Sequence, residues 1–129
     1  MSSLIQPNIV SYRAGAAIAY GVACKPGADG QHVVKAGAAA TDKAIGINQS
    51  TDATAAEDTV ELAVIGGGAE AKAGGTIAMG DELGFDTDGK LVKVASASDR
   101  VIAIALEAAV LNDLFSVMVV AHKAVGTQA

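Results

Sequence analysis

Four acidic residues lie between positions 81 and 88, in the sequence MGDELGFDTDGKLVKV, and carboxylates at this spacing can bind a divalent cation. Asp86, Asp88 and Gly89 match positions 3, 5 and 6 of a calcium-binding EF-hand loop, which also needs oxygen ligands at positions 1 and 12. In this register position 1 is Gly84 and position 12 is Ala95, and neither side chain carries an oxygen. We therefore expect neither a metal site nor a cofactor here.

The same Asp-Gly pair predicts a turn. Glycine adopts a positive φ without a Cβ clash, so Asp-Gly between two alternating segments is a strong β-hairpin signal. Asp88-Gly89 precedes the strand-like Leu91–Val94, and Asp29-Gly30 precedes the weaker pattern at Gln31–Lys35. We interpret Asp29, Gly30, Asp88 and Gly89 as structural turn residues.

Other residues of types that can bind metals or act in catalysis also lack partners at a useful spacing. His32 and His122 have no cysteine or carboxylate at the spacing of a zinc site, and no Gly-x-Ser-x-Gly sequence occurs. The one cysteine, Cys24, lies in an apolar segment, where a buried and inert thiol is the usual case. We expect no catalytic residues and no enzymatic activity.

Composition and charge exclude two classes of partner. The net charge is −5, and the nine lysine and arginine residues form no cluster, so we expect no nucleic-acid binding. The apolar run from Val101 to Val120 is interrupted by Glu107, Asn112 and Asp113, which fits two strands and a turn rather than a membrane span. We expect no membrane partner and, from the start of the sequence, no signal peptide.

Short strands separated by glycine-rich turns predict an all-β fold. Val60–Ile65 alternates between apolar and polar residues, and Phe115–Val120 is apolar on both faces. Further strands are expected at Ile18–Cys24, Ala44–Asn48 and Val101–Leu106, with at most one short helix near 52–57. The expected architecture is a small β-sandwich or a partly closed β-barrel.

The sequence also repeats itself. Asp29-Gly30 and Asp88-Gly89 are 59 residues apart, Ile45–Ile47 and Ile102–Ile104 are 57 apart, and Asp58–Val64 and Asp113–Val119 are 55 apart. Loop deletions explain such a shrinking offset. We predict one β domain over 14–122 that consists of two related halves, approximately 14–66 and 74–121, followed by a C-terminal tail at 123–129.

Two segments are candidate interfaces. Residues 1–13 are either a first edge strand or an extended arm that docks on a partner. The hypothesis that this segment binds a partner rests on the side chains of Leu4, Ile5, Pro7, Ile9, Tyr12 and Arg13. The chain has only two Phe, two Tyr and no Trp, so its core is thin and association would supplement it. The strand that is apolar on both faces provides the hypothetical oligomer interface, with Phe115, Val117, Met118 and Val119.

The order of these motifs resembles a known family. GxxIxxGDxLxxDxDGKLVKV at 74–94, followed by RVIAIALEAA at 100–109, is similar to the small capsid decoration, or cement, proteins of tailed bacteriophages. The segment AIGI at 44–47, the strand at 60–66 and the VMV sequence at 117–119 extend the similarity over roughly residues 5–121.

This resemblance implies a function that composition alone does not. It implies a non-enzymatic structural protein that binds the major capsid protein on the outer surface of the virion. It also implies a homo-oligomer, a homotrimer in preference to a homodimer, that bridges neighbouring subunits and stabilises the shell after synthesis in the host bacterial cytoplasm. The alternative function is a small surface- or carbohydrate-binding β module of a phage tail or receptor-binding assembly.

Overall fold

The computed structural model describes residues 8–37, 42–51, 55–94 and 100–123, and within these ranges the chain contains ten strands and no helix. The strands are β1 (Ile9–Ala14), β2 (Ala23–Pro26), β3 (His32–Lys35), β4 (Gly46–Asn48), β5 (Thr59–Ala63), β6 (Gly68–Lys72), β7 (Glu82–Phe85), β8 (Leu91–Lys93), β9 (Arg100–Ala105) and β10 (Leu114–Lys123). The all-β prediction is confirmed. The possible helix near 52–57 falls partly outside the described residues.

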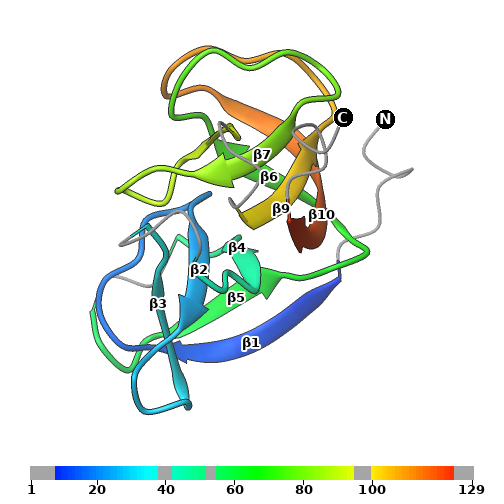
Figure 1. Ribbon diagram of the computed structural model, residues 1–129. Coiled ribbons are helices and arrows are strands. Elements are labelled where there is room, and N and C mark those ends of the chain that lie inside the picture. The colour runs from blue at the N-terminus through cyan, green and yellow to red at the C-terminus, as the bar shows by residue number, and fades with distance from the viewer. Residues whose placement is uncertain (1–7, 38–41, 52–54, 95–99, 124–129) are drawn as a thin grey trace.

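The ten strands form a barrel and a separate sheet (Figure 1). The barrel has the order β1-β3-β2-β4-β5 and closes because β1 also pairs antiparallel with β5. The second sheet has the order β6-β10-β9-β7-β8. In Figure 1 this sheet lies above the barrel.

The two sheets share one strand order. When β6 to β10 are matched in sequence order to β1 to β5, the order of the second sheet corresponds to β1-β5-β4-β2-β3. This is the strand order of the barrel with the β1–β3 pairing opened. The register agrees as well, since Asn48 faces Leu62 in the barrel and Ala105 faces Val117 in the second sheet. A single parallel bridge, Ala73 to Leu91, stands where the barrel has its parallel β1–β3 pairing.

Two apolar clusters hold these layers together. The smaller cluster fills the barrel and includes Ile18, Cys24 and Leu62, so the expected burial of Cys24 is confirmed. The larger cluster combines barrel residues such as Ile47 with residues of the second sheet such as Phe115. Because many members are alanines, close backbone approach rather than large side chains fills this interface.

The acidic glycine corners are hairpin connections. Gly30 has φ 71° between the antiparallel strands β2 and β3, and Gly89 has φ 79° between β7 and β8. Gly89 also lies against the barrel, because Ala23 donates a backbone hydrogen bond of 2.8 Å to its carbonyl. A Cβ at Gly89 would stand 3.1 Å from Cβ of Val22, so this turn requires glycine for space as well as for conformation.

Candidate functional site

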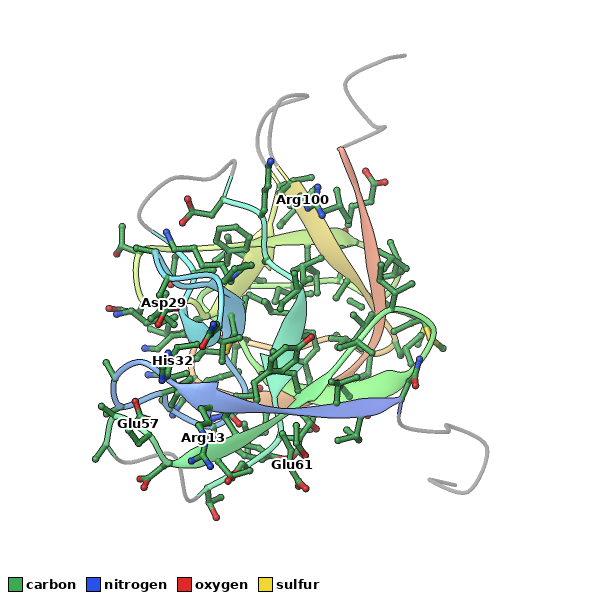
Figure 2. The ribbon with its side chains drawn as sticks, turned by 90° about the horizontal axis from the view of Figure 1, so that it is seen from below. Arg13, Asp29, His32, Glu57, Glu61 and Arg100 are labelled. Atoms are coloured by element: carbon green, nitrogen blue, oxygen red, sulfur yellow. The ribbon has the colours of Figure 1, made fainter. Side chains whose placement is uncertain are left out.

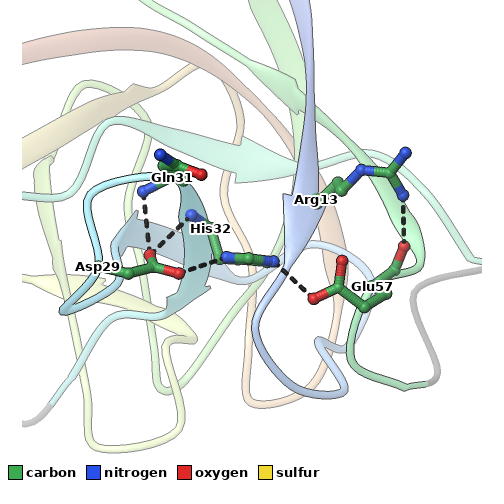
Figure 3. Close-up of polar contacts among 5 residues, drawn as sticks. All are labelled: Arg13, Asp29, Gln31, His32 and Glu57. Atoms are coloured by element: carbon green, nitrogen blue, oxygen red, sulfur yellow. Dashed lines mark hydrogen bonds and ion pairs between the residues drawn. The ribbon is translucent and has the colours of Figure 1, made fainter.

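His32, at the start of β3, lies between two carboxylates (Figure 3). Its Nδ1 is 2.5 Å from Oδ2 of Asp29, and its Nε2 is 2.6 Å from Oε2 of Glu57. The histidine side chain is one-quarter exposed, with 24% of its surface accessible. We call the three residues Asp29, His32 and Glu57 the histidine clasp.

Local backbone geometry positions each member of the clasp. Asp29 sits in the β2–β3 turn, where its Oδ1 accepts the backbone N–H groups of Gln31 (2.9 Å) and His32 (3.0 Å). Glu57 has φ 71°, which is rare for a residue with a side chain. Nη1 of Arg13, the β1 residue paired with His32, donates to the Glu57 carbonyl at 3.2 Å.

The clasp shifts the pKa of two of its members. Backbone hydrogen bonds from Gln31 and His32, followed by the bond to the His32 ring, lower the pKa of Asp29 from 3.8 to about 2. The hydrogen bond to Asp29 and then the one to Glu57 raise the pKa of His32 above 6.5. The imidazole therefore stays charged at a pH where a free histidine has lost its proton.

This geometry favours a structural role for the clasp. General-base catalysis on a nucleophile requires one ring nitrogen to face a hydroxyl or thiol, whereas both nitrogens of His32 face carboxylates. The clasp instead joins the β2–β3 turn to the connection before β5, on either side of β1. Across the described parts of the chain, no three His, Cys, Asp or Glu side chains gather as metal ligands would.

Only one of the two contacts of His32 has a local sequence signal. Asp29 and His32 are three residues apart across a predicted turn, so a contact between them can be predicted from the sequence. Glu57 is 25 residues further on, and only closure of the barrel brings it to His32. The side chain of the other histidine, His122, is not among those that the structure describes.

The acidic segment between Asp81 and Asp88 leads into a turn of the chain. Oδ1 of Asp86 accepts the backbone N–H groups of Asp88 (2.9 Å) and Lys90 (3.1 Å), which fixes the β7–β8 turn. Oδ1 of Asp88 lies 3.8 Å from Nζ of Lys35 on the barrel. Asp86 is thus engaged in turn formation, and Asp88 contacts the other half.

The candidate partner residues of the first segment have two different settings. Leu4, Ile5 and Pro7 lie outside the described residues, whereas Ile9, Tyr12 and Arg13 lie on β1. β1 pairs with β5 over five residues, so this part of the segment is a barrel strand rather than an extended arm. Ile9 is nevertheless 39% exposed, which leaves its side chain accessible.

The proposed oligomer strand has a buried and a half-buried face. Phe115, Val117 and Val119 are at most 2% exposed and pack inside the chain, against the barrel and the rest of the second sheet. Met118 lies on the opposite face and is half-buried. A contact between copies through β10 would have to use the Met118 face.

An apolar hollow lies beside β1. It is lined by Val10 and Tyr12 of β1, by Ile45, Val64 and Ile65, and by Arg100 of β9. Arg100 is labelled in Figure 2. Val10 is 41% and Ile65 57% exposed. Nε of Arg100 is buried and has no hydrogen-bond acceptor within the described structure, although buried donors are normally paired. We call this hollow the β1 groove.

The fold of this chain is similar to that of a known phage protein, whereas its sequence matches no known family. No family model and no curated protein matches the sequence. A solved structure, the head fiber gp8.5 N base of bacteriophage phi29, superimposes with a TM-score of 0.64 and covers 91% of this chain and 98% of its own. The two chains share a fold. Their sequence identity is 23%. Among the described residues, no helix could span a membrane.

Proposed function

We propose that this chain is a non-enzymatic structural protein of a bacteriophage head. It binds the major capsid protein on the outside of the virion as a homo-oligomer and stabilises the shell by bridging neighbouring subunits. The observation that carries the proposal is the fold shared with the phi29 head fiber base over nearly the whole of both chains. The order of sequence motifs that resembles capsid decoration proteins supports it independently.

The β1 groove is the proposed contact with the shell. Its exposed apolar side chains match the apolar core of a protein interface. A partner segment that lies in the groove can supply the acceptor that Nε of Arg100 lacks. Leu4, Ile5 and Pro7 precede β1 in the sequence, and we propose that they contribute to the same contact.

The mechanism is mechanical. Each copy buries surface across the boundary between capsid subunits, so rupture of the shell must break these contacts as well as those of the shell itself. Specific interfaces typically bury about 1,600 Å² in total. Repetition over a lattice adds avidity, and the contribution of each contact can therefore be modest.

The direct test adds purified protein to phage capsids that lack it and measures co-sedimentation. We expect saturable binding, and capsids with the protein bound should resist heating better than bare ones. The variant Ile65→Asp, which places a charge in the β1 groove, should bind less, while Lys93→Glu, at an exposed position that does not line the groove, should bind normally. Absence of binding by the folded wild-type protein would overturn the proposal.

A second candidate function, carbohydrate binding, has one feature in its favour. A second hollow, between the two halves, is lined by Tyr20, Thr51, Lys72 and Lys90, which combines an aromatic ring with polar groups. The Tyr20 hydroxyl donates to Oε1 of Glu70 at 2.8 Å, and burial together with this bond raises its pKa to about 12. Binding on a glycan array that is lost in Tyr20→Ala would favour this alternative.

A further inference from the structure

Two connections occupy equivalent places in the two halves. The first-half tip, residues 55–59, leads into β5, and the second-half tip, residues 110–114, leads into β10. Glu57 and Asn112 have φ 71° and 69°, and they are the two residues other than glycine with positive φ in the described chain. Their N–H groups donate to Ala14 and Ala73, each at 2.8 Å. The two tips therefore have one backbone geometry.

The side chains on the two tips differ in kind. The second-half tip carries Val110, Leu111 and Leu114, which are 57%, 59% and 50% exposed. The equivalent residues of the first-half tip are Ala55, Ala56 and Thr59, all of which are small and exposed. Since the backbone is the same, the turn itself does not require large apolar residues. A cluster of exposed apolar side chains is typical of an interaction surface.

The charged groups around the two tips also differ. The side chains at and beside the first-half tip include two basic and four acidic groups: Arg13, His32, Asp29, Glu57, Asp58 and Glu61. The equivalent positions of the second half include two basic and two acidic groups: Lys72, Asp88, Lys90 and Asp113. The first-half tip is thus acidic, whereas the second-half tip is apolar, electrically balanced and flanked by lysines.

We infer that the second-half tip of one copy docks on the first-half tip of a second copy of this chain. The apolar side chains of 110–114 then cover the small side chains of Ala55 and Ala56, while Lys72 and Lys90 approach the acidic groups around Glu57. Opposite charges at facing positions favour this pairing over contact between two identical tips. The inference rests on the homo-oligomer part of the proposed function and names its interface.

The positions of the tips set the symmetry of the assembly. In Figure 1 the second-half tip lies at the top of the molecule and the first-half tip at the lower left. A contact between two different surfaces is heterologous, and repetition of it generates a ring if the rotation closes and a filament if it does not. A closed ring leaves no tip exposed, which accounts for the apolar second-half tip.

Complementation between two variants tests the interface. Leu111→Asp places a charge in the apolar second-half tip and leaves the first-half tip intact. Ala56→Arg places a positive charge in the first-half tip, where it repels the lysines of the docking copy, and leaves the second-half tip intact. Each variant alone should self-associate at least about tenfold more weakly than the wild type. A mixture should form a one-to-one dimer, because one undamaged tip remains on each variant. Sedimentation velocity measures all three states, and circular dichroism checks that both variants fold.

The control Ile65→Asp separates this inference from the proposed function. It changes an apolar residue of similar exposure, 57% against 59%, but in the β1 groove. It should self-associate normally and bind capsids poorly. A wild-type protein that is monomeric at all concentrations, a normal oligomer of Leu111→Asp, or a mixture that stays monomeric would each overturn the interface. Capsid binding measured in the same samples reports on the proposed function separately.

Discussion

Nε2 of His32 lies 2.6 Å from the carboxylate of Glu57, although 25 residues separate them in the sequence. The contact crosses β1, whose two-residue parallel pairing with β3 helps to close the barrel. Together, the contacts of the His32 imidazole with Asp29 and Glu57 link the β2–β3 turn, β3 and the connection before β5. The barrel closure thereby becomes sensitive to the protonation of a single side chain.

We predict that thermal stability is greatest at about pH 4–6.5 and falls on both sides of this range. The pKa of His32 is raised above 6.5 in the folded protein, so its contribution is complete below the unfolded value and is lost as the pH rises through the folded pKa. The pKa of Asp29 is lowered from 3.8 to about 2, so its contribution is present above 3.8 and is lost as the pH falls through about 2.

Melting temperatures measured across this pH range check the prediction. His32→Gln should flatten the decline on the alkaline side but retain the decline on the acidic side, because Asp29 still accepts the backbone N–H groups of the turn. An NMR titration of His32 gives its pKa directly. A midpoint at or below 6.5 would contradict the clasp.

The two Asp-Gly turns supply a matched pair of substitutions. Gly30 and Gly89 have similar positive φ values, 71° and 79°, so alanine costs about 1–2 kcal/mol of backbone strain at either site. A Cβ at Gly30 meets nothing within 4 Å, whereas one at Gly89 stands 2.9 Å from Cγ of Lys35. We expect Gly89→Ala to cost about 1–3 kcal/mol more than Gly30→Ala.

Urea denaturation of the two glycine variants measures this difference. Equal losses in the free energy of unfolding would show that the second-half turn does not press on the barrel. The comparison is internal to one protein, so changes in the unfolded chain, which are the same for both substitutions, cancel.

The sequence predicted the elements that have local signals. Asp-Gly marked both hairpins, and apolar alternation marked β5. It missed β6, whose sequence GAEAK contains no large apolar residue and lay in the expected gap between the halves. β6 is a strand because β10 supplies its hydrogen bonds and the core accepts Ala71, and both conditions depend on tertiary structure. The partnership of His32 with Glu57 was missed for the same reason.

A buried amide provides the next prediction. Asn48 is 0% exposed, and its Nδ2 donates to the carbonyls of Ile18 (3.2 Å) and Ala19 (3.0 Å). Its Oδ1 accepts the N–H of Ser50 at 2.7 Å. Asn48→Leu removes the hydrogen bonds to the carbonyls of Ile18 and Ala19, at a cost of about 1–3 kcal/mol for each carbonyl that water does not reach.

Denaturation of Asn48→Leu should therefore show a large loss of stability despite the gain in apolar volume. The equivalent position of the second half is Ala105, which shows that the strand pairing itself does not require the amide. A stable Asn48→Leu variant would mean that the connection from Ile18 to Ala19 can rearrange to bind water.

The last prediction concerns the orphan donor of the β1 groove. Arg100→Met keeps much of the apolar stem but removes the buried Nε that lacks an acceptor. Removal of an unpaired buried donor relieves its desolvation cost, so the isolated protein should keep its stability or gain about 1 kcal/mol.

If a capsid segment supplies the missing acceptor, the same substitution should weaken capsid binding roughly tenfold, since hydrogen bonds to charged groups contribute about 1.5–3 kcal/mol. Lys93→Met is the control, because Lys93 is exposed and does not line the groove. Paired measurements of unfolding and of co-sedimentation with capsids distinguish the two effects: lower stability of Arg100→Met with unchanged capsid binding would show that Arg100 serves the fold rather than the partner.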